Sequence, residues 1–314
     1  MRLAVVVPTL NEAAHVETLV RRLLSGLDGN RDTDSKADSN GGPEGEPTTT
    51  SKDQAATAYD RADLVVVADG GSTDATLERL AALQAEFEAD AKQPHSTGEA
   101  PVPSETRMAR GSLADEQATN SNPEAPRPDT AHRAPLTVIH GPAGRGIQQR
   151  DGAAAILPEL DEEDLLVFVH ADNLPEPGAL AALQAAAARG GNAFAMRQHV
   201  DAEGDFYRAV ERYAERRAAR GRVYGDSCLA VRAGTYRAVG GFRPLPLFED
   251  LDLARRLAAR GPIVLVDGAY VRVCARRWQK EGKTVTVVRN WLLTRGFELR
   301  LPPRLLAAFY PRHS

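Results

Sequence analysis

Cysteine is scarce in this sequence: only Cys228 and Cys274 occur among 314 residues, with no CxxC pair and no Cys/His cluster. This argues against a structural zinc site or a disulfide scaffold, and both thiols are expected to be reduced and structural. No apolar run approaches the roughly 20 residues that cross a bilayer. A strand starts at Leu3 with no signal-peptide pattern before it, so we expect a cytoplasmic protein.

Large apolar side chains are almost missing from two segments, residues 28–57 and 91–134, which are rich in Gly, Pro, Ser, Thr, Asn and charge. Such segments cannot offset the entropy of ordering, so we predict two long disordered insertions. Their net charges are −4 and −1, which leaves about +1 for the rest of the chain. A folded part so close to neutral gives no sign of a nucleic-acid partner.

Outside the insertions, short apolar runs alternate with apolar residues at helical spacing. This order predicts an α/β fold: one domain over residues 1–314, with a doubly wound, mainly parallel sheet flanked by helices. The helix after the second strand is expected to be capped by Ser72 and Thr73, with Asp74 in its first turn. The predicted strands are Leu3–Val7, Leu64–Val67, Leu136–Ile139 and Asp164–Val169.

All four predicted strands end in polar or glycine-rich stretches: "PTLNE" at 8–12, "ADGGSTD" at 68–74, "GPAGRG" at 141–146 and "HADN" at 170–173. Loops of this kind are also needed simply to turn the chain and cap helices. Ligands of open α/β sheets bind outside the carboxyl ends of the strands, however, and four such ends together favour a polar ligand. "VPTLNE" contains no glycine, which argues against the phosphate loops of NAD-dependent enzymes and of sugar-phosphate nucleotidyltransferases.

Several strings in one order resemble a known family: "VVVPTLNE", "LVVVADGGSTD", "GRGIQQRDGAAA", "LLVFVHAD", "GGFRPLPLFEDLDLARRL" and "ARRW". Together they resemble glycosyltransferase family 2, with its GT-A fold, and within it the rSAM/selenodomain-associated (arsenosugar-type) branch. The resemblance implies transfer of a sugar from a UDP- or GDP-sugar to an acceptor hydroxyl, with inversion at the anomeric carbon.

The resemblance assigns the nucleotide to the first strand end, with contacts from Pro8, Thr9, Asn11 and Glu12. Thr9 and Asn11 could equally cap the following helix. At the second strand end, Asp69 would accept a hydrogen bond from the base or the ribose. Gly70 stands where the family commonly has a second aspartate.

Two further strand ends are expected to face the donor diphosphate. Arg145 lies in a glycine-rich loop that opens a helix, a place suited to phosphate, although it could also be a surface charge. After the fourth strand, the family's acids hold Mg²⁺ or Mn²⁺. Here His170 replaces the first acid, so Asp172, with or without His170, is the expected metal ligand. The alternatives are a strand-end histidine and a turn-forming aspartate.

The acceptor side is assigned from the downstream strings. Asp250 matches the family's general base, and Glu249, an acid favoured by the helix dipole in any case, is its reserve. Asp226 matches a GD in the family string, and Arg277 and Trp278 match the end of a QxxRW motif whose glutamine is Cys274 here. The absence of this glutamine indicates transfer of a single sugar and not processive synthesis of a polymer. We expect Asp69, Asp172 and Asp250 to converge on one opening.

Residues 272–314 form a basic, apolar C-terminal region with ten Lys or Arg and two Glu. Such a region can pack its apolar side on the domain, or it can lie on an anionic membrane surface, which would suit a lipid acceptor in place of a small molecule. Two functions other than sugar transfer are also compatible with the sequence. The substitutions at Gly70 and His170 fit a nucleotide-sugar binding protein that has lost its catalytic activity. The predicted order of strands and helices also fits a sugar-phosphate nucleotidyltransferase.

Overall fold

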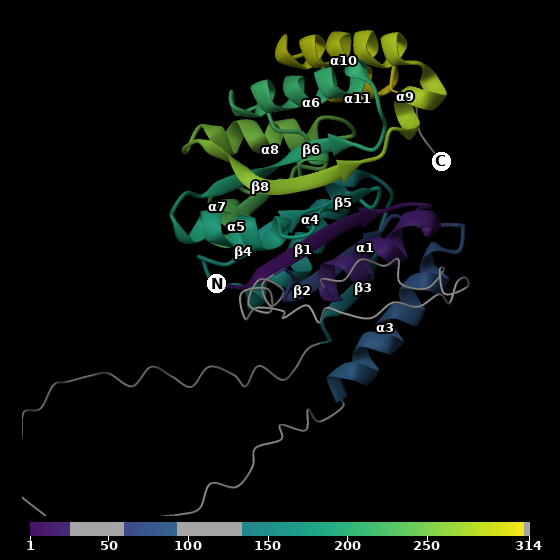
Figure 1. Ribbon diagram of the computed structural model, residues 1–314, viewed down its shortest axis with the longest axis vertical. Helices are drawn as coiled ribbons and strands as arrows, with labels where there is room; N and C mark the ends of the chain where they lie inside the picture. Colours follow the sequence, from purple (N-terminus) through teal and green to yellow (C-terminus); the bar gives the residue numbers. More distant parts are fainter. Residues whose placement is uncertain (26–59, 93–133, 311–314) are drawn as a thin grey trace, which may run out of the picture.

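The computed structural model describes residues 1–25, 60–92 and 134–310 (Figure 1). The two predicted disordered insertions therefore lie outside the described residues, apart from positions 91, 92 and 134. Residues 91 and 92 form the end of helix α3 (Thr76–Lys92), so the second segment was predicted to begin too early.

The predicted α/β fold is confirmed: helices flank an eight-stranded sheet of order β3-β2-β1-β4-β7-β6-β8-β5. Four of its seven strand pairings are parallel. All four predicted strands are present, and they pair in parallel with one another. They are β1 (Leu3–Thr9), β2 (Leu64–Asp69), β3 (Leu136–His140) and β4 (Leu165–Phe168).

The second half of the sheet was not predicted. β7 (Ala230–Arg232) runs antiparallel to both β4 and β6 (Ala193–Val200). β8 (Ile263–Val273) is parallel to β6 and carries the three-residue edge strand β5 (Asn173–Pro175). These strands place the segments after residue 190 beside the carboxyl end of β4.

Helices cover both faces of the sheet because the fully buried β1 points alternate residues into two cores. Leu3, Val5 and Val7 face the core with α1 (Ala13–Ser25), α3 and α5 (Ala179–Ala188). Ala4 and Val6 face the other core, with α4 (Arg145–Ile156), α7 (Ala233–Ala238) and α8 (Glu249–Ala258). The remaining helices are α6 (Asp205–Ala218), α9 (Arg276–Glu281), α10 (Lys283–Glu298), α11 (Pro303–Ala307) and the 3-10 turns η1 (Leu157–Glu159) and η2 (Gly225–Ser227).

The start of α3 corrects one prediction. Asp74, not Ser72 or Thr73, caps this helix: its carboxylate accepts hydrogen bonds from the backbone N–H and the hydroxyl of Thr76. The other carboxylate oxygen of Asp74 accepts a bond from the N–H of Ala13, which opens α1. Ser72 and Thr73 are left free to bond across to the end of β1.

A buried ion pair ties α1 to α5. Arg22 donates to Asp60 over 2.8 Å, and Asp60 also accepts bonds from the N–H groups of Gly178 and Leu180 at the start of α5. Asp60→Ala would leave a buried guanidinium and two amide groups without this acceptor. We expect it to lower the free energy of unfolding by about 3–5 kcal/mol in chemical denaturation. Glu86→Ala, which breaks the exposed Arg21–Glu86 pair, is the matched control and should cost under about 1 kcal/mol.

Candidate active site

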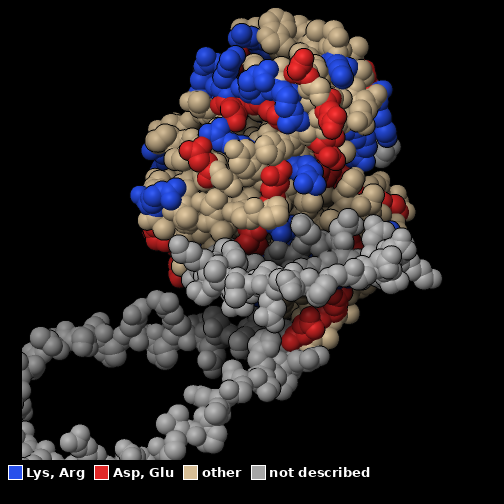
Figure 2. Space-filling model, in the orientation of Figure 1, with Lys and Arg blue, Asp and Glu red and all other residues tan. Residues whose placement is uncertain are grey.

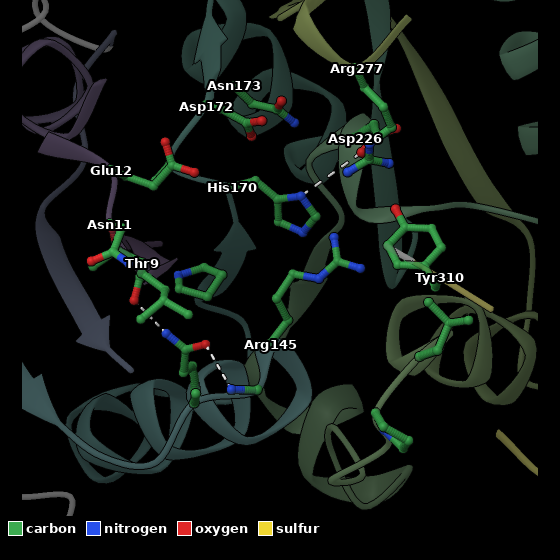
Figure 3. A pocket seen from close by; sticks show the side chains of 18 of the residues that line it. Thr9, Asn11, Glu12, Arg145, His170, Asp172, Asn173, Asp226, Arg277 and Tyr310 are labelled. Atoms are coloured by element: carbon green, nitrogen blue, oxygen red, sulfur yellow. Dashed lines mark hydrogen bonds and ion pairs between the residues drawn. The ribbon is translucent and has the colours of Figure 1, made fainter. Parts of the chain in front are cut away.

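A cavity of about 760 Å³ opens at the carboxyl ends of β1 and β4, where α4 begins (Figure 3). The far wall comes from the C-terminal helices α9, α10 and α11. The cavity therefore lies where the parallel strand order predicts a ligand site. Ten of the thirteen predicted site residues line it: Pro8, Thr9, Asn11, Glu12, Arg145, His170, Asp172, Asp226, Arg277 and Trp278.

The end of β1 is fixed by bonds to neighbouring loops. The backbone N–H of Asn11 donates to the Ser72 hydroxyl, and the Asn11 side chain accepts a bond from the N–H of Thr73. The Gln148 amide on α4 donates to the carbonyls of Thr9 and Ala68. Asn11 is held at a φ of 54°, a left-handed conformation that only asparagine and few other side chains tolerate. The loop is thus positioned before any ligand binds.

Glu12 and Asp172 face the same part of the cavity, with Arg276 between them. The guanidinium lies 3.6 Å from a Glu12 oxygen and 4.0 Å from an Asp172 oxygen. Burial, followed by the charge of Asp172, raises the pKa of Glu12 to about 7 although Arg276 opposes the shift. The second Glu12 carboxylate oxygen, Oε2, is buried and has no hydrogen-bond partner. One guanidinium therefore leaves negative charge here uncompensated, which suits a further cation.

His170 sits on the cavity floor in a tight enclosure. Its Nδ1 lies 3.9 Å from an Asp226 oxygen, and its buried Nε2 has no hydrogen-bond partner. Burial, and then the nearby charge of Arg145, lowers the His170 pKa, so the ring is neutral at neutral pH. A Cβ on Gly225 would come within 2.3 Å of this ring, so only glycine fits there.

Asp250 lies behind Gly225 and is not part of the cavity lining. Its carboxylate accepts bonds from the N–H groups of Gly225 (2.7 Å) and Leu251 (2.6 Å). Burial, and then the charge of Glu249, raises the pKa of Asp250 to about 7. Phe248, immediately before this acidic pair, has a φ of 63°, a strained conformation of the kind found at functional sites.

Arg145 joins the floor to the buried acids. It projects from the start of α4 into the cavity, and its Nε lies 3.2 Å from Glu249, which is almost completely buried at the start of α8. The charge of Glu249 is the largest cause that raises the pKa of Arg145. A permanent cation is therefore anchored at a helix N-terminus, the arrangement that recognises phosphate.

The wall from the C-terminal helices is cationic and aromatic. The Arg277 guanidinium lies 5.3 Å from the centre of the Tyr310 ring, and Trp278 packs edge-on against Tyr207. Five residues that line the cavity are positively charged: Arg145, Arg276, Arg277, Lys280 and Arg304. Three are negatively charged: Glu12, Asp172 and Asp226.

The expected convergence of three aspartates is therefore corrected: only Asp172 of the three reaches the cavity lining. The Asp69 carboxylate is directed into its own turn, where it accepts bonds from the N–H groups of Gly71 and Ser72 and from the Ser72 hydroxyl. Gly70 has no room for an aspartate, since even a Cβ would come within 2.9 Å of the Gln148 amide. Asp250 and Glu249 lie just beneath the floor.

Several lining residues were not singled out from the sequence. Arg276 stands next to Arg277 in "CARRW", and nothing in that string tells which arginine faces the acids. Tyr310, Asn290 and Arg304 lie far along the chain in the basic region, which was expected to pack on the domain or to contact a membrane, and not to line the cavity. Gln148 is part of the quoted "GRGIQQRDGAAA". Its hydrogen bonds to the ends of β1 and β2 form only because α4 packs on the sheet, which the string does not reveal.

The donor atoms present fit a divalent cation only in part. Glu12 Oε2 is buried without a partner and Asp172 lines the same cavity, so carboxylate ligands are available, whereas the unpartnered His170 Nε2 is packed against Gly225. Among the residues that the structure describes, no group of three or more His, Cys, Asp or Glu side chains is placed to hold a metal ion. Mg²⁺ and Mn²⁺ commonly bind through one or two carboxylates, with substrate phosphates as the other ligands.

Comparison with known proteins gives no family assignment: no family profile and no curated protein sequence matches this chain. Solved structures with a similar arrangement include TarS of S. aureus, at 14% identity over 87% of this chain and 37% of that chain, with a TM-score of 0.47. A mannosyltransferase from Pyrobaculum calidifontis, solved with GDP-Man and Mn²⁺, is similar at 17% identity over 86% and 56%, with a TM-score of 0.48.

A third similar structure is glucosyl-3-phosphoglycerate synthase from Mycobacterium tuberculosis, solved with Mn²⁺, UDP and glucosyl-3-phosphoglycerate. Its identity is 15% over 87% of this chain and 70% of that chain, with a TM-score of 0.39. The chain spans well under two thirds of the length of TarS and of the mannosyltransferase. With all three TM-scores below 0.5, the function has to be argued from the site itself.

The raised pKa of Glu12 predicts a pH-dependent stability. The raised pKa keeps a proton on Glu12 in the folded state up to about pH 7, whereas the unfolded chain releases it near 4.5, the ordinary pKa of a glutamate. Folding stability should therefore fall as the pH rises between these values and then stay level. Glu12→Gln removes the ionised form, and we expect it to stabilise the protein at pH 8 by about 1–2 kcal/mol, allowing for solvent screening.

Denaturant titrations at pH 4 and pH 8 measure this effect. The two proteins should have equal free energies of unfolding at pH 4, and the variant should be more stable at pH 8. Glu88→Gln, at an exposed position of α3, is the control and should change neither value. Equal stabilities of wild type and Glu12→Gln at pH 8 would contradict the uncompensated charge at this site.

Proposed function

We propose that this protein is a glycosyltransferase of the GT-A type, which moves one sugar from a nucleotide diphosphate sugar to an acceptor hydroxyl. One observation carries the proposal. A single cavity at the carboxyl ends of parallel strands holds carboxylates with unpartnered donor atoms on one side, and fixed cations at a helix N-terminus and on the C-terminal helices on the other. A diphosphate bridged by a cation needs both groups within one site.

The nucleoside would lie against the end of β1, where Pro8, Thr9 and Asn11 form a rigid edge of the cavity. The diphosphate would then extend towards Arg145 at the start of α4 and Arg277 of α9. Both guanidiniums can pair with phosphate oxygens and stabilise the charge on the leaving group. Asp69 supports this edge through its bonds to the turn that holds Asn11, and Trp278 offers an aromatic face for a sugar.

Asp172, with Glu12 or His170 as a second ligand, would hold Mg²⁺ or Mn²⁺, and substrate phosphates would supply the rest. When bound, the ion would neutralise charge on the donor phosphates as the bond to the sugar breaks. Of the two His170 nitrogens, Nε2 is packed against Gly225, so Nδ1, 3.9 Å from an Asp226 oxygen, is the one that could reach an ion. Arg276 is placed to compensate Glu12 and Asp172 until the ion and donor arrive.

Inversion requires a base that takes the proton from the acceptor hydroxyl on the face opposite the diphosphate. We keep Asp250 as the proposed base, since a pKa of about 7 balances deprotonation against proton affinity near neutral pH. Its carboxylate lies behind Gly225, so this role requires Gly225 to move when the acceptor binds. Glu249 contributes by raising that pKa and by orienting Arg145. Asp226, which lines the cavity beside His170, would position the acceptor, a lipid or a small molecule.

Nucleotide diphosphate release tests the proposal. Purified protein is incubated with UDP- and GDP-sugars, Mn²⁺ or Mg²⁺ and a panel of hydroxyl acceptors, and free UDP or GDP is measured. We expect release with one donor class only, dependent on the divalent ion and strongly reduced in Arg145→Gln. Tight donor binding with no release for any acceptor would favour a binding protein, and no binding of either donor class would contradict the proposal.

A further inference from the structure

Helix α10 presents an apolar face to its surroundings. Trp291, Leu292 and Leu299 are 53%, 56% and 78% exposed, and Val285 and Val288 are also exposed. Positions 285, 288 and 292 repeat at helical spacing, so they form one stripe, with Trp291 at its side and exposed Arg295 one turn further along. Leu299 follows the end of the helix, and the next segment adds exposed Leu301, Leu305 and Phe309. We refer to these eight residues as the outer face.

The inner side of α10 is part apolar, with Leu293 buried against Leu247 and Leu306, and part polar. Arg289 pairs there with Glu281 of α9, and Thr286 and Asn290 line the cavity. In the orientation of Figure 1, α10 lies at the upper edge of the molecule, and no described helix or strand is drawn beyond it. An exposed apolar surface of this extent, on the outermost helix, indicates a site that contacts a membrane or another protein.

The exposed charges of the segment that carries the outer face all have one sign. Both acids of this segment are mostly buried and paired: Glu281 with Arg289, and Glu298 with Arg222 and Arg295. Within described residues 276–310, the exposed charged residues are all basic. Lys283, Arg295 and Arg300 lie outside the cavity lining, whereas Arg276, Lys280 and Arg304 belong to it. In Figure 2 the top of the molecule is largely tan, with Lys and Arg and some Asp and Glu side chains below it.

We propose that the outer face of α10 and α11 docks on an anionic lipid bilayer. A helix lying in the membrane interface needs apolar residues on one side, an aromatic ring at headgroup depth and flanking Lys or Arg, and this region has all three. A second copy of the chain fits poorly, because the two sets of cations would oppose each other. A peptide partner would need a groove, whereas this face is a convex helix surface that a fluid bilayer can enclose.

Vesicle flotation tests the docking. The probes are vesicles of phosphatidylcholine alone and vesicles with 30% phosphatidylglycerol, each at low and at 0.5 M salt. We expect binding to the anionic vesicles at low salt and at least about tenfold weaker binding at high salt. The double variant Trp291→Glu/Leu292→Glu should bind at least about tenfold more weakly, since it places two anions within the apolar stripe.

Ala185→Glu/Ala188→Glu adds the same two charges to exposed positions of α5 and should bind like the wild type. Thermal melting checks that both double variants fold. Absence of flotation with anionic vesicles at low salt overturns the proposal, and so does equal binding of the Trp291→Glu/Leu292→Glu variant. A concentration-dependent dimer that this variant dissociates, without vesicle binding, would assign the face to a second copy and also overturn it. Sugar transfer is not measured, so the result does not depend on the proposed function.

Discussion

Asp172→Asn is expected to reduce metal-dependent nucleotide release by at least about 100-fold in kcat/KM, because the site loses its most accessible carboxylate ligand. Glu12 and His170 cannot replace it. The Glu12 carboxylate carries a proton up to about pH 7, and His170 is a neutral ligand that brings no charge to balance the ion. The loss should be accompanied by a weaker effect of Mn²⁺ on donor binding, measured by calorimetry with the donor in the presence and absence of the ion.

The matched control for Asp172→Asn is Asp90→Asn, the same change at an exposed position of α3. It should leave activity and metal dependence unchanged. The hypothesis that Asp172 holds the ion is wrong if Asp172→Asn retains full Mn²⁺-dependent activity. It is equally wrong if donor binding in this variant responds to Mn²⁺ as strongly as in the wild type.

Asp250→Asn is expected to lower kcat by about 10²–10⁴-fold while leaving the donor Kd within a few-fold of the wild-type value, as for loss of a general base. The wild-type rate should rise with pH and level off above about pH 7, since only the ionised carboxylate can accept the proton. In the variant this rise should disappear from the residual activity. A wild-type rate that is flat between pH 5.5 and 8.5 would contradict the assignment.

Asp226→Asn distinguishes the two acids that flank Gly225 as candidates for the base. Asp226 lines the cavity and Asp250 lies behind Gly225, so a direct role of Asp226 in proton transfer is the competing assignment. We expect Asp226→Asn to raise the acceptor KM with a smaller effect on kcat. If it instead removes the pH-dependent rise while Asp250→Asn keeps it, Asp226 is the base. Thermal melting of both variants distinguishes these outcomes from loss of folding, because Asp250 accepts two backbone bonds.

The first half of the sheet could be predicted because its strands are short apolar runs that are buried on both faces. For β1 the sequence pattern and the structure agree almost residue for residue. The strands β6 and β8 were missed: each begins with four apolar residues and continues into polar ones, and β8 is also partly exposed. Their position depends on pairing with distant segments, as shown by β8, which joins β6 in parallel and β5 in the opposite direction.

The candidate site, like the sheet, could be predicted only in part. Asp69 and Asp172 each come at or shortly after the end of an apolar strand, so a local pattern treats them alike. In the structure, Asp69 bonds to its own turn and Asp172 faces the cavity beside Glu12 and Arg276. The placement of Asp250 beneath the floor and the side of α10 that faces outward also depend on neighbours that are remote in the chain.

Local patterns in the sequence were enough to predict the α/β class, the carboxyl-end location of the site and ten of the residues that line it. Apolar runs and polar strand ends are local properties, and the parallel sheet brings those ends to one edge. Only the tertiary structure decided which acids reach the cavity, which of two adjacent arginines compensates them and which side of α10 faces outward. Those outcomes are set by burial and by charges from distant segments, and neither is encoded in the spacing of a short motif.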